Sequence, residues 1–251
     1  MTGSENKSVC GCTADERTIL ILDYDGTLHD SRVVYEPAFR RVMKEITELG
    51  WIPEAEYTSE EINYWVGFTA KEMWERFHPE LSPEQRETAG KQIGHYMLED
   101  IKAGKGQLYH GVEKTLEELS SRYELLFFSN CDHAYMEAHC KAFGLDRWID
   151  EFYCTGDYGW LPKEEVFEQY IRKSGRKYIA VGDRIKDMLL AQHCGFKAVG
   201  CLYGFGSREE LEGADICIED ITELMAAVDS IACPQGAHFI VCSHFAERNG
   251  D

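Results

Sequence analysis

The chain contains no long hydrophobic segment. None of its apolar runs approaches the length needed to cross a membrane. Its first seventeen residues are polar and lack the apolar centre of a signal peptide. We therefore expect a cytoplasmic protein with no membrane partner.

Basic residues are scarce. The chain has 26 lysines and arginines against 45 acidic residues, which gives a net charge of -19. Such a surface repels nucleic-acid backbones and anionic lipids, and this excludes both as general partners. An anionic substrate must therefore be held locally, by a metal ion and a few well-placed cations.

The usual cysteine spacing of a zinc or redox site is also missing. Among 251 residues there are ten cysteines but no Cys-x-x-Cys, which favours buried thiols in a reducing compartment over disulfides. There is no internal repeat, and 44% hydrophobic residues suffice for one large domain or a domain with an insertion. Two terminal groups could hold a metal, although neither has a standard zinc spacing: Cys10 with Cys12, and Cys233 with His238, Cys242 and His244.

The most informative segment is Thr-Ile-Leu-Ile-Leu-Asp-Tyr-Asp-Gly-Thr-Leu, at positions 18–28. Its apolar run predicts a buried strand, and alternation along a strand places Asp23 and Asp25 on the same side of its C-terminal end. Open α/β sheets bind their ligands at that end. Two carboxylates about 4 Å apart repel by roughly 4 kcal/mol at an effective dielectric constant of about 20, so the pair needs a cation or a shared proton. Magnesium is the expected counter-ion.

A calcium loop and a plain turn are the alternatives. The register excludes an EF-hand, because Gly26 is the fourth residue from Asp23 rather than the sixth, and the twelfth is Val34 rather than glutamate. Asp-Gly is also common turn chemistry, so the segment taken alone leaves a plain turn open. A plain turn does not explain the second acid before it.

Helical patterns dominate the next part of the chain. An apolar face that starts at Ala38 and includes Leu49 predicts a helix that ends at Gly50. Two capping boxes, Thr69 with Glu72 and Ser82-Pro83 with Gln85, predict helices near 70–77 and 83–102. The glycine-containing segment 102–107 has the composition of a hinge. We expect residues 31–108 to form an inserted helical cap domain.

From Gly111 onward the pattern changes to alternating helices and strands, with strands at 124–129, 151–154, 178–181, 198–201 and 216–218. This alternation predicts a Rossmann-like parallel sheet with helical crossovers, to which the Asp23 strand also belongs. The expected α/β core domain therefore comprises residues 1–30 and 109–251.

Polar residues follow other strands of this sheet and should share its C-terminal edge with Asp23. Ser129 and Asn130 end one strand and could bind an oxyanion, although a Ser-Asn turn explains them equally well. Asp183 ends another and Asp187 lies four residues later on the same helix face, but Asp183 could also be an ordinary cap. Lys163, at the start of a helix, could reach a phosphate, although a lone lysine is more often solvated.

Four acids and a lysine at strand ends suit phosphoryl transfer through a carboxylate nucleophile and one divalent cation. The chain resembles the haloacid dehalogenase superfamily, whose four ordered motifs match from Thr18 to about Ala227. It is most similar to the phosphoglycolate-phosphatase-like branch with a helical cap. Segments 109–112 and 203–211 are also similar to stretches typical of that branch. Two departures are His110, where proline is usual, and Lys163-Glu-Glu-Val-Phe, which lacks the prolines that commonly follow the lysine.

The resemblance implies roles for these residues. Asp23 would attack phosphorus, and Asp25 would act as acid and base, which favours phosphate esters over the dehalogenase and phosphonate-cleaving branches. Magnesium would be held by Asp23, the Asp25 carbonyl and Asp183, with Asp187 in support. The phosphoryl oxygens would be bound by Ser129, Asn130 and Lys163.

The resemblance leaves the substrate open. It implies a small phosphorylated metabolite as the substrate, and we expect a monomer or homodimer. Thr69 and Lys71 lie where this branch often places specificity contacts. A helix cap explains Thr69 equally well, and a solvated lysine explains Lys71 equally well. A phosphomutase of the same fold is the nearest alternative. A non-catalytic binding module should have lost Asp23, Asp25 or Asp183. A dinucleotide-binding site is disfavoured because Gly204-Phe-Gly206 lacks the third glycine.

Overall fold

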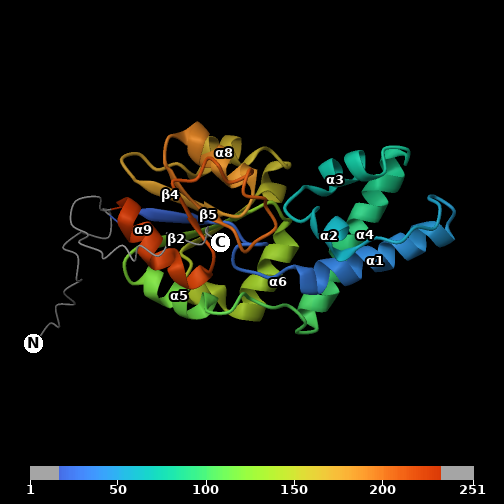
Figure 1. The fold of residues 1–251 in the computed structure, drawn as a ribbon, viewed down its shortest axis with the longest axis horizontal. Helices are drawn as coiled ribbons and strands as arrows, with labels where there is room; N and C mark the ends of the chain where they lie inside the picture. Colours follow the sequence, from blue (N-terminus) through green and yellow to red (C-terminus); the bar gives the residue numbers. More distant parts are fainter. Residues whose placement is uncertain (1–16, 233–251) are drawn as a thin grey trace, which may run out of the picture.

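The computed structural model describes residues 17–232 (Figure 1). Within that range no helix is long and apolar enough to cross a membrane. The two terminal cysteine and histidine groups considered above lie outside the described residues.

Six parallel strands form one sheet in the order β3-β2-β1-β4-β5-β6. The predicted Rossmann-like parallel sheet is confirmed, and each predicted strand agrees with the observed one to within a residue. The bounds are β1 Ile19–Leu22, β2 Glu124–Ser129, β3 Glu151–Cys154, β4 Tyr178–Gly182, β5 Lys197–Cys201 and β6 Ile216–Ile218.

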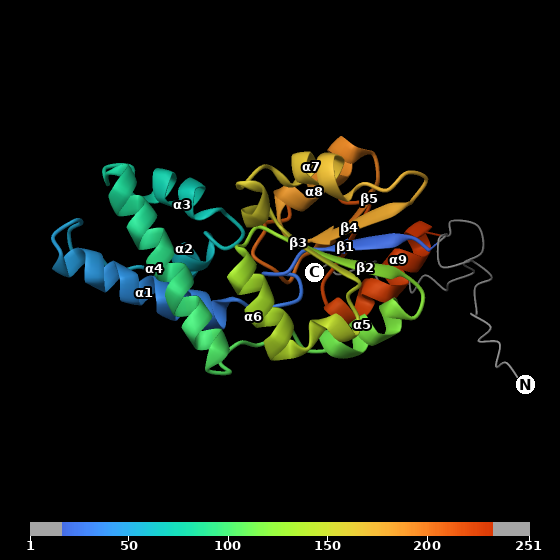
Figure 2. The ribbon, with the colours of Figure 1, turned by 180° about the vertical axis from the view of Figure 1, so that it is seen from behind.

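The central strand β1 is buried on both faces. Leu20 and Leu22 pack in a cluster that contains residues of α5, Val112–Ser120, and α9, Leu224–Ala232. Ile19 and Ile21 pack on the other face, toward α7, Lys163–Val166, and α8, Ile185–Cys194. Helices cover the two faces of the sheet in both ribbon views (Figures 1 and 2), with α6, His133–Phe143, on the same side as α5. This double burial explains why the strand appears in the sequence as an unbroken apolar run.

The register of β1 brings distant residues together. Leu22 pairs with Phe127 of β2 and with Val181 of β4, so the three strands end at the same level. The residues that follow these strands therefore share one edge of the sheet, next to which the chain leaves β1 for α1 (Figure 1).

Four helices separate β1 from α5: α1 Arg32–Glu48, α2 Ser59–Asn63, α3 Ala70–Phe77 and α4 Pro83–Lys102. They enclose an apolar cluster of their own, with Phe39 and Trp74 fully buried. The predicted capping boxes that begin α3 and α4 are confirmed. Leu49, expected on the apolar face of the first helix, instead follows the last residue of α1 and is exposed.

Short helical turns complete the described chain. They are η2 Leu145–Arg147, η3 Thr155–Tyr158, η4 Phe167–Ile171 and η5 Ile221–Glu223. The η3 turn directly follows β3 and so lies at the same edge of the sheet as the end of β1. The η4 turn continues α7 with wider, π-type winding.

Candidate active site

Three carboxylates and one ammonium group form a buried cluster at the end of β1. The Lys163 Nζ atom lies 2.8 Å from Asp23 Oδ1 and 2.6 Å from Asp187 Oδ1, and all three side chains are nearly inaccessible to solvent. Oxygens of Asp23, Asp183 and Asp187 lie within 4.8 Å of one another. The structure thus brings together four residues that the sequence placed at separate strand or helix ends.

The cluster carries more negative than positive charge. Burial and the neighbouring Asp187 charge raise the pKa of Asp23 to about 7, although Lys163 opposes this shift. Burial and the charge of Asp23 raise the pKa of Asp183 well above its ordinary value. Although burial disfavours the charged lysine, the two carboxylates raise the pKa of Lys163. An additional cation would relieve this repulsion, and an all-oxygen donor set suits magnesium.

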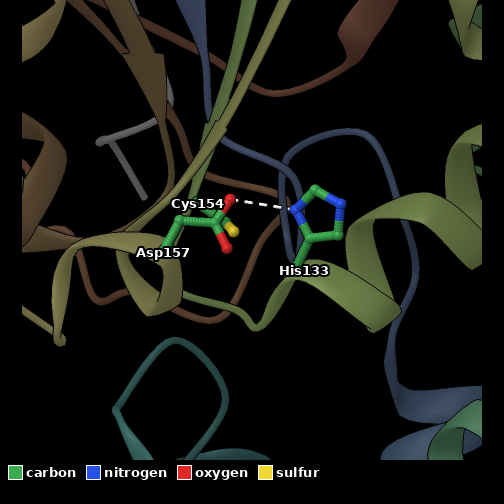
Figure 3. Close-up of side chains that lie close together, drawn as sticks. All are labelled: His133, Cys154 and Asp157. Carbon is green, nitrogen blue, oxygen red and sulfur yellow. Dashed lines mark hydrogen bonds and ion pairs between the residues drawn. The ribbon is translucent and has the colours of Figure 1, made fainter.

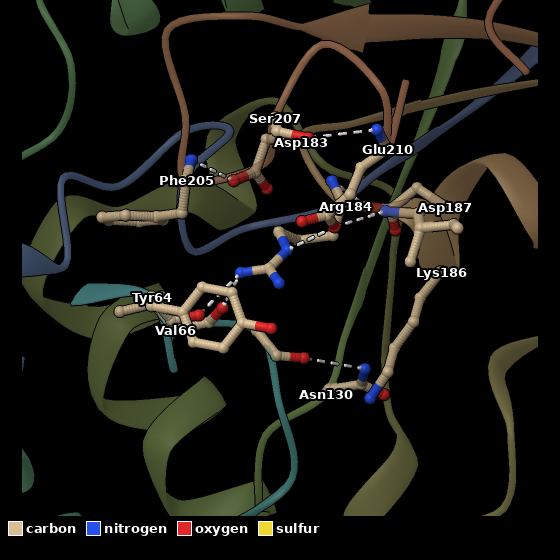
Figure 4. Close-up of polar contacts among 12 residues, drawn as sticks. Tyr64, Val66, Asn130, Asp183, Arg184, Lys186, Asp187, Phe205, Ser207 and Glu210 are labelled. Carbon is tan, nitrogen blue, oxygen red and sulfur yellow. Dashed lines mark hydrogen bonds and ion pairs between the residues drawn. The ribbon is translucent and has the colours of Figure 1, made fainter. Parts of the chain in front are cut away.

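Asp183 is held by the segment after β5. The Phe205 N–H donates to Asp183 Oδ2 at 2.7 Å (Figure 4). A Cβ atom on Gly206 would lie 1.9 Å from the Asp183 carbonyl oxygen, and one on Gly204 would lie 2.3 Å from the Asp183 Cβ. The glycine pair therefore allows the backbone to approach Asp183 closely, which explains its presence without a nucleotide.

Asp25 has different partners. The His29 Nδ1 atom and the Tyr135 hydroxyl each lie 2.9 Å from Asp25 Oδ1. Burial alone would raise the pKa of Asp25, but these hydrogen bonds and the neighbouring histidines lower it below its ordinary value. The sequence analysis missed both partners. The spacing of His29, four residues after Asp25, was an available signal, whereas nothing in the sequence points to Tyr135.

Ser129 and Asn130, at the end of β2, also lie at this edge of the sheet. Ser129 is buried, and the Asn130 Oδ1 atom accepts a hydrogen bond from Thr155 at 3.1 Å. The Asn130 side-chain nitrogen lies 3.5 Å from the Gly67 carbonyl oxygen, between α2 and α3 (Figure 4). Asn130 thus connects the edge of the sheet with the helical insertion.

A cavity of about 410 Å³ opens at this edge. Six of the predicted site residues line it: Asp23, Asp25, Ser129, Asn130, Lys163 and Asp187. Thr69 and Lys71 are not among its lining residues, although Ala70 between them is. Thr69 caps α3 through Glu72, and Lys71 is exposed. Their specificity role stays a prediction.

Arg184 is a further residue that sequence reasoning missed. It precedes α8 and is buried, and its Nη1 atom donates to the carbonyl oxygens of Val66 at 2.6 Å and Tyr64 at 3.1 Å (Figure 4). Its Nε atom donates to Glu210 at 3.0 Å. Arg184 therefore attaches the loop after α2 to the core.

A second group of possible metal ligands lies nearby, at the ends of β2 and β3. His133 Nδ1 is 2.9 Å from Asp157 Oδ2, with the Cys154 sulfur beside them (Figure 3). A hydrogen bond from Cys131 lowers the pKa of the Cys154 thiol. Sulfur and imidazole donors suit zinc rather than magnesium, so this group is chemically distinct from the carboxylate cluster.

The structure is a Rossmann-like parallel sheet with an acidic cluster at the end of β1. A model of the haloacid dehalogenase-like hydrolase family matches residues 20–201, more than half of the chain, and the chain belongs to this family.

Similar proteins agree with this assignment. A phosphoglycolate phosphatase from Colwellia psychrerythraea is 24% identical over 230 residues, which cover 85% of this chain and 97% of that protein. A 5'-nucleotidase from Pseudomonas aeruginosa is 26% identical over 199 residues, covering 76% of this chain and 86% of the relative. A haloacid dehalogenase-like hydrolase from Streptococcus pneumoniae has a similar fold, with a TM-score of 0.71 at 24% identity; the match covers 86% of this chain and 99% of that one.

Proposed function

We propose that the protein is a magnesium-dependent phosphatase that hydrolyses a small phosphate ester through an aspartyl-phosphate intermediate on Asp23. The observation that carries the proposal is the buried cluster of Asp23, Lys163, Asp183 and Asp187, which combines carboxylates, an ammonium group and surplus negative charge. Three of its members, Asp23, Lys163 and Asp187, line the cavity. Such a set is suited to phosphoryl transfer, where positioning and charge stabilisation supply most of the catalysis.

In the first step an Asp23 oxygen forms a bond to phosphorus, and the bond between phosphorus and the ester oxygen breaks. Asp25, which is ionised in the free protein and must first gain a proton as the anionic ester binds, gives that proton to the leaving oxygen. In the second step a water molecule attacks the phosphorus, returns a proton to Asp25 and releases inorganic phosphate and free Asp23. His29 and Tyr135 hold the Asp25 carboxylate in position for both transfers.

Lys163, Ser129 and Asn130 bind the phosphoryl oxygens in this proposal. Asp23, Asp183 and the Asp25 backbone carbonyl would hold a magnesium ion with support from Asp187, whose carboxylate also binds Lys163. The ion supplies positive charge that balances the carboxylates and the phosphoryl group. The raised pKa values of Asp23 and Asp183 are consistent with this part, because burial and the neighbouring carboxylates disfavour their charged forms and a bound cation would favour them.

We further propose that residues 31–108 are a cap domain over a core of residues 1–30 and 109–251. The separate apolar cluster of α1 to α4 supports this division. The cavity is lined by Trp65 and Met73 from the insertion as well as by Asp23 from the core. Closure of such a cap would exclude bulk water from the reaction.

The names of the relatives, a phosphoglycolate phosphatase and a 5'-nucleotidase, support a small phosphorylated metabolite as the substrate. The test is a screen of phosphate esters with magnesium, in which released phosphate is measured for the wild type and for Asp23→Asn. We expect turnover by the wild type and a loss of at least about 1,000-fold in a folded variant, because no neighbouring group replaces the nucleophile. Activity retained by folded Asp23→Asn would show that Asp23 is not the nucleophile. A rearranged phosphorylated product without released phosphate would indicate a phosphomutase.

A further inference from the structure

A large part of the cavity lining is apolar. Its lining includes the large hydrophobic side chains of Trp65, Phe68, Met73, Ile93, Leu98 and Trp160. Its volume of about 410 Å³ lies in the range of roughly 300–1,000 Å³ that is typical of pockets for larger organic ligands. A phosphoryl group and a two-carbon alcohol would leave much of this apolar surface in contact with water.

The cationic side chains that line the cavity already have acidic partners. Arg184 is bound to Glu210 at 3.0 Å and to two backbone carbonyls, and Lys163 is bound by the catalytic carboxylates. The remaining pairs, within residues 17–232, are Lys91 with Glu87 at 2.6 Å, Lys186 with Glu72 at 2.6 Å and His95 with Glu99 at 3.3 Å. The cavity therefore offers little attraction to a second anionic group, such as a carboxylate on the leaving alcohol.

Trp160 is held in an unusual conformation beside this cavity. Its φ angle is +63°, and it is the one residue other than glycine in the described chain with a positive φ. The conformation is strained for a bulky residue, and such strain often occurs at ligand sites. The Trp160 N–H donates to the Thr155 carbonyl oxygen at 2.8 Å, which holds the loop in place.

The indole of Trp160 is available to a ligand. Trp160 lines the cavity, and 47% of its surface is exposed, which is unusual for a large hydrophobic residue. Trp160 lies in the loop before α7, three residues before Lys163, which begins that helix, and both residues line the cavity. A molecule that places its phosphoryl group at Lys163 can therefore bring its other end near the indole.

We infer, on the basis of the phosphatase function proposed above, that the substrate is a phosphate monoester whose alcohol carries an uncharged planar ring, and that this ring stacks on Trp160. Apolar side chains of the lining contact the ring, and cations that already have acidic partners attract an acidic leaving group less. Trp160 is then the residue that determines specificity for flat alcohols.

The test measures binding separately from turnover. Calorimetry with magnesium-loaded Asp23→Asn protein compares 2-phenylethyl phosphate, 2-cyclohexylethyl phosphate and phosphoglycolate. If the cavity binds ligands only through hydrophobic burial, the more hydrophobic cyclohexyl ester should bind more tightly. If the ring stacks on an indole, the planar phenyl ester should bind more tightly. We expect the phenyl ester to bind about tenfold more tightly than the cyclohexyl ester, and phosphoglycolate to bind most weakly. If Asp23→Asn does not fold, the KM values of the magnesium-loaded wild type for the three esters are compared instead.

Variants assign the preference to one side chain. Trp160→Ala should reduce the phenyl preference to less than about twofold, while Trp160→Phe keeps most of it. Tyr170→Ala removes an exposed aromatic outside the cavity and should leave the preference unchanged. Equal or tighter binding of the cyclohexyl ester or of phosphoglycolate, or an unchanged preference in Trp160→Ala, overturns the inference. Failure of the wild type to release phosphate from any ester rejects the phosphatase proposal instead.

Discussion

The guanidinium of Arg184 lies 2.6 Å from the carbonyl oxygen of Val66. These residues are 118 positions apart in the sequence. The hydrogen bond joins the start of α8, which packs against the sheet, to the loop between α2 and α3. The space around it is tight, because a Cβ atom on Gly67 would lie 3.0 Å from Arg184 Cγ. The contact therefore holds this loop of the helical insertion against the start of α8.

Arg184→Ala should loosen this attachment. We expect a loss of about 2 kcal/mol in the free energy of unfolding, because two carbonyl oxygens lose a charged donor. Hydrogen exchange of residues 64–68 should accelerate and kcat/KM should fall. Arg32→Ala, which removes an exposed pair with Asp30, is the control and should cost less than about 0.5 kcal/mol. Unchanged exchange at 64–68 in Arg184→Ala would show that the contact does not hold the loop.

Magnesium should stabilise and activate the protein through Asp183. EDTA should abolish turnover, and added magnesium should restore it and raise the melting temperature. In Asp183→Asn we expect at least about a tenfold loss of magnesium affinity by calorimetry, because a buried carboxylate ligand becomes neutral. Asp100→Asn, in an exposed pair with Lys105, should bind magnesium normally. Normal turnover after exhaustive chelation contradicts the metal-dependent mechanism.

Gly206→Ala tests the close approach at Asp183. The added Cβ would lie 1.9 Å from a backbone oxygen, so the segment must move and the Phe205 hydrogen bond to Asp183 must weaken. We expect a loss of at least about 2 kcal/mol in stability together with weaker magnesium binding. Gly94→Ala in α4, where the new Cβ meets nothing within 4 Å, should stabilise the protein by about 0.5–1 kcal/mol. Thermal and chemical denaturation measure both changes in stability. A Gly206→Ala protein as stable as the wild type would argue against the close approach of this backbone segment to Asp183.

His139 should make the protein sensitive to acid. Burial lowers the pKa of His139 to about 3, and the Tyr24 hydroxyl lies 2.7 Å from its Nδ1 atom. In the unfolded chain its pKa is about 6.5, so between about pH 6.5 and 3 the unfolded state binds a proton that the folded state does not. Stability should therefore fall as the pH decreases through this window, by at most about 1.4 kcal/mol per pH unit from this group.

The measurement is urea denaturation at several pH values. His139→Gln keeps a hydrogen-bonding side chain without the titration and should show a smaller slope. His95→Gln, at an exposed position, should retain the wild-type slope. Identical slopes in the wild type and His139→Gln would exclude this histidine as the cause.

Residues that interact within one strand or one helical turn were predictable. The six strands, the capping boxes of Thr69 and Ser82, and the position of Asp23 at a strand end follow from apolar runs and from side chains that bind their own backbone. Leu49 was placed wrongly because the chain leaves the helix at Glu48, where the apolar pattern still continues.

The sequence by itself therefore determined the parallel sheet, the acids at its edge and the helical character of the insertion, because these depend on short-range patterns. Only the tertiary structure decided which groups surround the acids. Tyr135 reaches Asp25 across 110 positions and Phe205 reaches Asp183 across 22, while the loop after β3 places Trp160 at the cavity. Such contacts depend on how helices and loops pack over the sheet, and packing joins residues whose separation along the chain leaves no local signal.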